Sequence, residues 1–279
     1  MIFFAGMALY IASLNSGSNG NCYYIGNRDE AVLVDVGLSC TETEKRMRKL
    51  GLSMKTVKAI FISHEHTDHI KGVSTLANKY RLPVYITPAT AKGIRLIRHL
   101  AQPFKANEAV AIGELSVLPF TKRHDAADPH SFIISHFGIN VGVFTDIGCA
   151  CTQVKKHFSQ CHAAFLEANY DEDMLEKGAY PIHLKNRIRS DMGHFSNSQA
   201  LDLFIHHRQT SMTQLLLSHL SKDNNDPLRV KELFNSHAGK TEIIIASRYE
   251  PTGVYLVDLP GEGQEAKKSQ NPVQISLFG

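Results

Sequence analysis

The sequence lacks several features that would place it in other classes of protein. None of its 5 cysteines forms a C-x-x-C pair, which argues against a zinc ribbon. Their odd number and plain spacing are typical of reduced thiols in the cytoplasm. The formal net charge of +3 is too small to imply a nucleic-acid partner by itself. No later run is long and apolar enough to span a membrane. These absences leave a soluble cytoplasmic protein as our expectation.

Both ends of the chain differ in character from its middle. Residues 1–6 are apolar but lack the basic start of a signal peptide, so we expect an extension ahead of a first strand. Residues 260–271 contain no large apolar side chain, which is typical of a flexible linker. The 279 residues suffice for one domain with a sizeable core. We therefore predict one catalytic domain over residues 1–259 and a flexible tail over residues 260–279.

Short apolar runs alternate with amphipathic stretches along that domain. The predicted strands cover residues 8–14, 31–35, 58–62, 84–86, 115–121, 132–135, 141–145, 163–166, 214–217, 242–246 and 254–257. The predicted helices cover residues 43–50, 69–80, 89–99, 197–207 and 227–236. Interleaved strands and helices in two strand-rich halves indicate an α/β fold, a four-layer αββα sandwich.

The most informative segment is the run from Ser63 to His69, which reads S-H-E-H-T-D-H. It follows an apolar stretch, residues 59–62, that we interpret as a buried strand. Positions two apart point the same way in an extended segment, so His64 and His66 can hold one ion together. Asp68 and His69 follow where the chain turns into a helix and point toward a second ion. The alternative is a polar, histidine-rich surface loop, but such loops rarely combine these residue types at the end of a strand.

This run resembles the H-x-H-x-D-H signature of the metallo-β-lactamase fold. The family's later ligands each follow a strand, and His124, Asp146 and His219 stand in that order and context here. The resemblance implies two sets of metal ligands joined by a bridge: His64, His66 and His124; Asp68, His69 and His219; and Asp146 between them. Asp35 matches the early aspartate of the fold, which usually steadies a ligand histidine.

Two further motifs resemble those of the phosphodiesterase branch, which includes the tRNA 3′-processing nucleases. They are L-E-A-N around Glu167 and G-H-F-S-N around His194. The resemblance implies that Asp68, Glu167 and His194 are catalytic. His194 would protonate the leaving oxygen and Glu167 would orient His194. A structural histidine and a plain surface carboxylate are the alternatives for these two residues.

Three segments match one subgroup of this branch, the YycJ/WalJ-type nucleases. They are S-G-S-N-G-N at residues 16–21, H-D-A-A-D-P at 124–129 and G-H-F-S-N at 193–197. In the last, Phe195 replaces the usual leucine. The subgroup implies an exonuclease that degrades DNA from the 5′ end, using two metal ions and a metal-bound hydroxide.

Small polar residues in these segments are candidates for binding phosphate. Ser18 and Asn21 lie in a glycine-rich loop that could also be a tight hairpin turn. Ser196 and Asn197 stand where a helix begins, so they could bind phosphate or cap that helix. Two basic groups could follow a phosphate backbone or simply be solvated: Lys185, Arg187 and Arg189, and Lys92, Arg95, Arg98 and Lys105.

The tail ends in Q-I-S-L-F-G, which resembles the short motif by which bacterial proteins bind the DNA polymerase sliding clamp. The resemblance implies that Gln274 makes polar contacts and that Leu277 and Phe278 fill an apolar pocket. A chance match, or a strand packed on the domain, is the alternative. The motif lies outside the catalytic segment and therefore supports DNA metabolism on separate grounds.

Several rival functions share the metal site. One is an RNA-processing endonuclease, although we find no glycine- and proline-rich insertion that could grip tRNA. Others are a small-molecule phosphodiesterase or thioesterase, or a binding protein with structural metals. The expected cofactor is a pair of divalent ions, zinc or manganese, with iron possible, since five histidines and two aspartates suit all three.

Overall fold

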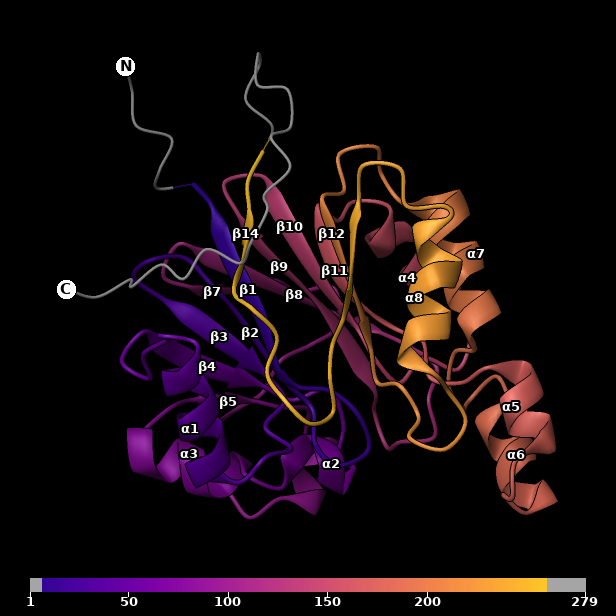
Figure 1. Ribbon diagram of the computed structural model, residues 1–279. Helices are drawn as coiled ribbons and strands as arrows, with labels where there is room; N and C mark the ends of the chain where they lie inside the picture. The colour runs from indigo at the N-terminus through magenta and orange to yellow at the C-terminus, as the bar shows by residue number, and fades with distance from the viewer. Residues whose placement is uncertain (1–6, 260–279) are drawn as a thin grey trace.

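The computed structural model describes residues 7–259, which form two seven-stranded sheets packed face to face with helices on both outer sides (Figure 1). The first sheet has the order β14-β1-β2-β3-β4-β5-β6 and the second β13-β12-β11-β10-β9-β8-β7. β14 thus brings the end of the described chain back to pair with β1. This is the predicted αββα sandwich.

The strands and helices have the following bounds. The first sheet contains β1 (Leu9–Asn15), β2 (Cys22–Gly26), β3 (Ala31–Val34), β4 (Val57–Phe61), β5 (Val84–Tyr85), β6 (Ala101–Gln102) and β14 (Tyr255–Val257). The second contains β7 (Val110–Ile112), β8 (Leu115–Thr121), β9 (His130–His136), β10 (Ile139–Phe144), β11 (Ala163–Glu167), β12 (Gln214–Ser218) and β13 (Glu242–Ile245). The helices are α1 (Cys40–Lys49), α2 (Thr67–Ile70), α3 (Val73–Tyr80), α4 (Thr152–Phe158), α5 (Glu172–Lys177), α6 (Ile182–Ile188), α7 (Asn197–His207) and α8 (Pro227–Asn235).

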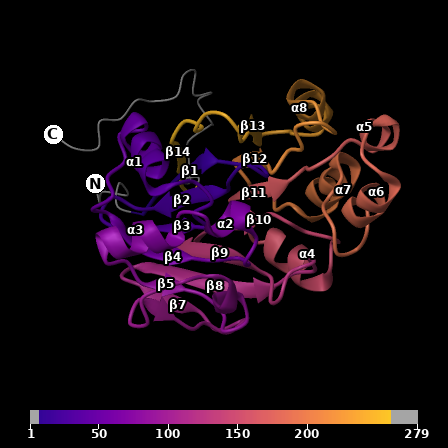
Figure 2. The same cartoon turned by 90° about the horizontal axis from the view of Figure 1, so that it is seen from below.

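Three apolar layers hold the sandwich together. The central layer lies between the sheets and joins residues such as Ile11 and Val34 to Val141 and Phe165. A second layer lies between the first sheet and helices α1 and α3, and a third between the second sheet and helices α4, α7 and α8 (Figure 2). Strands buried on both faces read as continuous apolar runs, which is why they were visible in the sequence. Among the described residues, we find no helix with the length and apolar character needed to cross a membrane.

Two predicted helices differ from the structure. The helix expected over residues 69–80 is split into α2 and α3 at Gly72, whose N–H donates to Val36 O at 2.8 Å. A Cβ atom at Gly72 would lie 1.9 Å from Leu38 O, so only glycine permits this approach. The prediction of a helix over residues 89–99 was wrong. Only a 3-10 turn, Thr90–Gly93, forms there, and Ile94 is extended because it packs, half-buried, against the outer layer of the first sheet.

The ends of several strands meet at one edge of the sandwich. β3 and β4 are parallel neighbours, and so are β10, β11 and β12. Parallel strands present their carboxyl ends on the same side of a sheet, where α/β proteins bind ligands. The candidate residues that follow these strands therefore gather from both sheets at that edge.

Candidate metal centre

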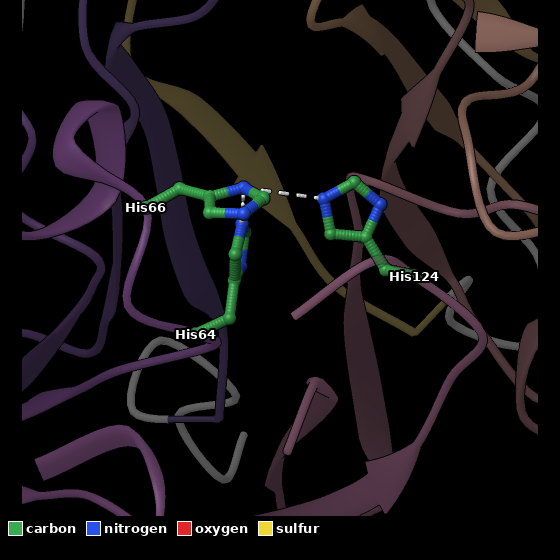
Figure 3. A group of neighbouring side chains, drawn as sticks. All are labelled: His64, His66 and His124. Atoms are coloured by element: carbon green, nitrogen blue, oxygen red, sulfur yellow. Dashed lines mark hydrogen bonds between the residues drawn. The ribbon is translucent and has the colours of Figure 1, made fainter. Parts of the chain in front are cut away.

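Three histidines from two loops point toward a common centre (Figure 3). His64 and His66 come from the loop between β4 and α2, and His124 from the loop after β8. His66 Nδ1 lies 3.1 Å from His64 Nε2 and 3.4 Å from His124 Nε2. One nitrogen from each ring lies within 4.8 Å of the others, a spacing that could hold a metal ion.

A second group of ligand atoms lies beside the first. Asp68, His69 and His219 place one ligand atom each within 4.8 Å of one another, and His64, His69 and Asp146 do the same. Asp146 spans the two groups, since its Oδ1 lies 3.8 Å from His124 Nε2 and its Oδ2 lies 3.1 Å from His69 Nε2. The structure thus brings together all seven residues that the sequence suggested as ligands, with Asp146 between the two groups.

Three of the residues in this region have left-handed backbone conformations. Asp35, Asp146 and His219 have φ angles of 60°, 53° and 56°, respectively. Residues other than glycine adopt this conformation rarely, and it costs free energy. Each of the three follows closely on the end of a strand, β3, β10 or β12, so the turn redirects its side chain into the site. Strain collected at one point in the fold is typical of a functional site.

Asp35 holds the first ligand loop in place. Its Oδ2 lies 2.7 Å from His69 Nδ1, and it also accepts hydrogen bonds from the main-chain N–H and the hydroxyl of Ser63, both at 2.8 Å. With Nδ1 engaged, Nε2 of His69 faces the ligand group. A carboxylate behind a ligand histidine fixes the ring and its tautomer.

The electrostatics of the two histidine groups differ. Burial lowers the pKa of His124 to about 4 and holds the pKa of His64 well below its ordinary value, so both rings are neutral. At His69, burial acts in the lowering direction, but Asp146, Asp35 and Asp68 raise the pKa to about 10. A divalent cation binding among these carboxylates would replace the extra proton.

The donor set fits divalent metal ions. Among the described residues, Oδ2 of Asp146 is buried and lies 3.1 Å from His69 Nε2 without the geometry of a hydrogen bond, and a buried carboxylate oxygen is costly to leave unsatisfied. Neutral imidazoles and ionised carboxylates are the ligands that such ions take. The buried oxygen and the converging ring nitrogens are therefore satisfied together when ions bind.

Glu167 is the last residue of β11 and lies beneath the two ligand groups. It is completely buried, so the alternative of a plain surface carboxylate was wrong. Its Oε1 lies 2.8 Å from His194 Nδ1 and 2.9 Å from His219 Nδ1, and its Oε2 accepts from the N–H of Ile147 at 2.6 Å. Burial alone would raise the pKa of Glu167, but the charge and hydrogen bond of His194 lower it to about 2. The ionised carboxylate thus orients two histidines at once.

Three of the four residues suggested for phosphate binding are buried and make contacts within the protein. Asn21 is buried, and its amide nitrogen lies 3.2 Å from Asp68 Oδ2 and 3.0 Å from His69 Nε2. Ser196 is the N-cap of α7 in a complete capping box, and Asn197 is buried against Asn225. Of the four side chains, Ser18 is the exposed one, so a phosphate in solvent can reach it.

The structure also adds residues that the sequence did not single out. Asn169 donates to His219 O at 2.7 Å, and Glu65 accepts from Ala127 N at 2.8 Å, which joins the two loops that carry the histidines. Ser63 bonds to Asp35. All three lie inside or beside the motifs already recognised, but their partners are distant in sequence. The sequence shows where these three residues lie, but it does not show which residues they bond to.

The basic group before His194 splits into two parts. Arg189 Nη2 donates to the carboxylate of Glu176 at 2.9 Å. Lys185 Nζ donates to the main-chain oxygen of the same residue at 2.5 Å. Arg187 Nε instead lies 2.5 Å from Asp125 Oδ2, whose other oxygen lies 3.3 Å from His124 Nε2. Asp125 therefore links Arg187 to the first histidine group, and the side chain of Arg187 remains half-exposed.

Comparison with known proteins identifies the family. Residues 16–121 match the family model described as the metallo-beta-lactamase superfamily. The chain is 35% identical over 224 residues to a Bacillus anthracis protein named exodeoxyribonuclease YycJ, covering 78% of this chain and 85% of that protein. The chain belongs to the metallo-β-lactamase superfamily.

Two other members of the superfamily extend the comparison. Exodeoxyribonuclease WalJ of Streptococcus pneumoniae (serotype 2) is 30% identical over 227 residues, which cover 79% of this chain and 83% of that protein. The crystal structure of the metallo-beta-lactamase fold protein YhfI from Bacillus subtilis superimposes with a TM-score of 0.69 at 15% identity, covering 89% of this chain and 99% of that one. The last comparison supports the fold alone. In this superfamily, the histidine and aspartate groups imply divalent metal ions.

Proposed function

We propose that the protein is a metal-dependent exodeoxyribonuclease that shortens DNA from the 5′ end. The similarity to proteins named YycJ and WalJ supports hydrolysis of DNA. The two adjoining groups of metal-ligating residues support hydrolysis of a phosphodiester with two ions. Residues 1–259 are the proposed catalytic domain, and the proposed location is the cytoplasm.

The proposed ligands are those suggested by the sequence. His64, His66 and His124 would hold one ion and Asp68, His69 and His219 the other, with Asp146 between the two groups. When bound, two such ions activate water and polarise the phosphoryl oxygens. Zinc or manganese suits this set best, with iron as the third candidate.

The geometry of His194 carries the proposal, because it suits the proton donor of such a reaction. Its Nδ1 is held 2.8 Å from the ionised Glu167, which turns Nε2 away from the carboxylate. Its side chain is 17% exposed, enough to touch a bound phosphate while remaining fixed. The carboxylate behind the imidazole fixes the ring, so that Nε2 is placed to donate a proton to the leaving oxygen.

The test is cleavage of DNA labelled at one end, with manganese added. The full-length protein is incubated with duplex DNA labelled at the 5′ end, the same duplex labelled at the 3′ end, and matched RNA. We expect the 5′ label to appear as a mononucleotide or short product and the 3′-labelled strand to shorten progressively. Asp146→Ala and His194→Ala should abolish or greatly reduce release, and His206→Ala, an exposed histidine of α7, should not.

Each alternative has its own result. Cleavage of RNA alone would favour the RNA-processing endonuclease, and cleavage of neither polymer would favour a small phosphodiester or thioester. A fully active Asp146→Ala protein that retains two ions would overturn the ligand assignment. Metal content measured by plasma mass spectrometry separates the two mutants, because His194→Ala should keep its metal and Asp146→Ala should lose it.

We also propose that the tail binds a bacterial sliding clamp. Gln274, Leu277 and Phe278 lie outside the described residues, and the proposal rests on their sequence. Surface plasmon resonance with immobilised clamp and full-length protein tests it. Joint replacement of Leu277 and Phe278 by alanine should abolish binding and preserve cleavage of short DNA. Equal binding by the double mutant would overturn this proposal without affecting the nuclease.

A further inference from the structure

The loop between β13 and β14 presents an aromatic ring to solvent beside a half-buried arginine. Tyr249 is 64% exposed, which is unusual for a large side chain with a ring. The guanidinium of Arg248 lies 6.0 Å from the centre of that ring. An aromatic side chain beside an arginine is the combination that proteins use to hold a nucleotide, the ring for the base and the cation for the phosphate.

The backbone of this loop is fixed from two sides, although the tyrosine ring is exposed. Arg46 Nη2 donates to Tyr249 O at 2.8 Å, and Asn19 Nδ2 donates to Arg248 O at 2.7 Å. Tyr249 N donates to Ser247 Oγ at 3.0 Å. A ring presented on an anchored backbone loses little conformational entropy when a ligand stacks on it.

Short hydrogen bonds connect the loop to the metal centre. Ser16 N donates to Ser247 O at 3.1 Å, and Ser16 Oγ accepts from the N–H of the candidate ligand His219 at 2.7 Å. Ser16 thus stands between the metal centre and the Arg248–Tyr249 pair. The pair lies on the rim of the site, within the reach of a strand bound at the ions.

Arg248 has capacity for an anion. Within the described residues, no carboxylate lies within 4.0 Å of its guanidinium, and its buried Nη1 has no hydrogen-bond partner, which leaves Nη2 as the atom on the exposed side. Its Nη2 donates to the exposed hydroxyl of Ser18 at 3.2 Å. The neighbouring Glu250 is paired with Lys49 at 2.6 Å, so it does not neutralise Arg248. A phosphate is the anion that a DNA strand would supply here.

We propose that Tyr249, Arg248 and Ser18 form a nucleotide-binding subsite on the rim of the metal centre. Tyr249 stacks on a base of the substrate strand, while Arg248 and Ser18 contact the adjoining phosphate. The subsite rests on the proposed action on DNA. It positions the strand and takes no part in the chemical step.

The test measures binding of a 3′-labelled single strand by fluorescence anisotropy, using full-length protein with manganese. Two strands of equal length are compared, one with normal bases and one fully abasic, both with phosphorothioate linkages that resist cleavage. Tyr249→Ala should raise Kd for the base-carrying strand about tenfold and leave Kd for the abasic strand unchanged. Tyr249→Phe should bind normally. Phe137→Ala, an exposed ring at the opposite end of β10, is the matched control.

Arg248 has a different signature. Arg248→Ala should weaken binding of both strands and reduce the dependence of log Kd on log salt by about one unit. Equal effects of Tyr249→Ala on the two strands, no effect on either, or no binding of either strand by the parent would overturn the subsite. Release of nucleotides from unmodified DNA is measured separately. A parent that binds in the expected way but releases none would overturn the nuclease and keep the subsite.

Discussion

His194 Nδ1 lies 2.8 Å from Oε1 of Glu167, a carboxylate with no exposure to solvent. The ring is thereby oriented by a group that is itself fixed, because Glu167 Oε2 accepts hydrogen bonds from two main-chain N–H groups at 2.6 and 3.3 Å. Such a buried, multiply bonded carboxylate is a rigid support for a proton donor.

Replacing this carboxylate with its amide should reduce turnover strongly. Glu167→Gln removes the carboxylate that holds His194 in position, and we expect kcat to fall by about 10² to 10⁴. His194→Ala and the double mutant complete the cycle. If Glu167 acts through His194, the two losses will be far from additive. Glu232→Gln, an exposed carboxylate of α8, is the control for the substitution itself. Fully additive losses would contradict the relationship.

The support of His69 by Asp35 should be visible in metal affinity. Asp35→Asn keeps an oxygen for the N–H of Ser63 but can turn an amide N–H toward His69 Nδ1, which disfavours the present tautomer. We expect metal affinity to fall about 10- to 100-fold, as measured by competition with a chelator. Unchanged affinity would show that Asp35 is only a folding residue. Thermal unfolding of the metal-free proteins separates these two effects.

His157 should make stability depend on pH away from the metal centre. It is buried against Phe120, with ring centroids 4.3 Å apart, and neither ring nitrogen has a hydrogen-bond partner among the described residues. Burial lowers its pKa below the ordinary value of 6.5. The unfolded chain therefore binds the proton more readily, so stability is intact above about pH 6.5 and falls as the pH drops below it.

The substitution His157→Phe tests this dependence because it keeps the stacking and removes the ionisation. The free energy of unfolding of both proteins is measured between pH 7.5 and 5, conditions chosen to bracket the ordinary histidine pKa of about 6.5. We expect a shallower decline with acidification in the variant. The difference between the two curves isolates His157, since the other histidines are common to both. Parallel curves would contradict the prediction.

Ser196 should contribute to stability as a helix cap. Its hydroxyl accepts from Gln199 N at 3.2 Å, and the Gln199 side chain accepts from Ser196 N at 3.0 Å. Ser196→Ala should lower the free energy of unfolding by about 1 kcal/mol, measured by urea denaturation. Ser196→Asp, which can also cap, should retain most of that stability. Unchanged stability together with a higher KM for DNA would instead favour a contact with phosphate.

The metal-ligating run could be recognised from the sequence because its information is local. His64 and His66 are two residues apart on an extended segment, so they point the same way whatever surrounds them. His124, Asp146 and His219 each follow a predicted strand, and the resemblance to the metallo-β-lactamase fold identified them, because that fold places ligands at strand ends. The layers of the sandwich were predictable for the same reason, since apolar runs identify strands that are buried on both faces.

Local pattern failed where packing overrides it. The sequence at residues 89–99 favoured a helix, but the chain there forms a 3-10 helix over residues 90–93 followed by irregular structure and a turn. Helices α5 and α6 have 6 and 7 residues, too few to display a helical period. Gly72 divides one predicted helix because a main-chain oxygen lies where a side chain would be.

By itself, the sequence determined the alternation of strands and helices and the pairing of His64 with His66, because these depend on apolar periodicity and short-range spacing; the other candidate ligands were implied by its resemblance to the metallo-β-lactamase fold. Only the tertiary structure decided that Glu167 serves both His194 and His219, that Asn21 faces the ligands, and that Arg248 meets Ser18 from 230 residues away. Those relationships depend on the register of two sheets and on how their edges pack. No local pattern carries that information, because a contact between distant segments is fixed by the whole fold.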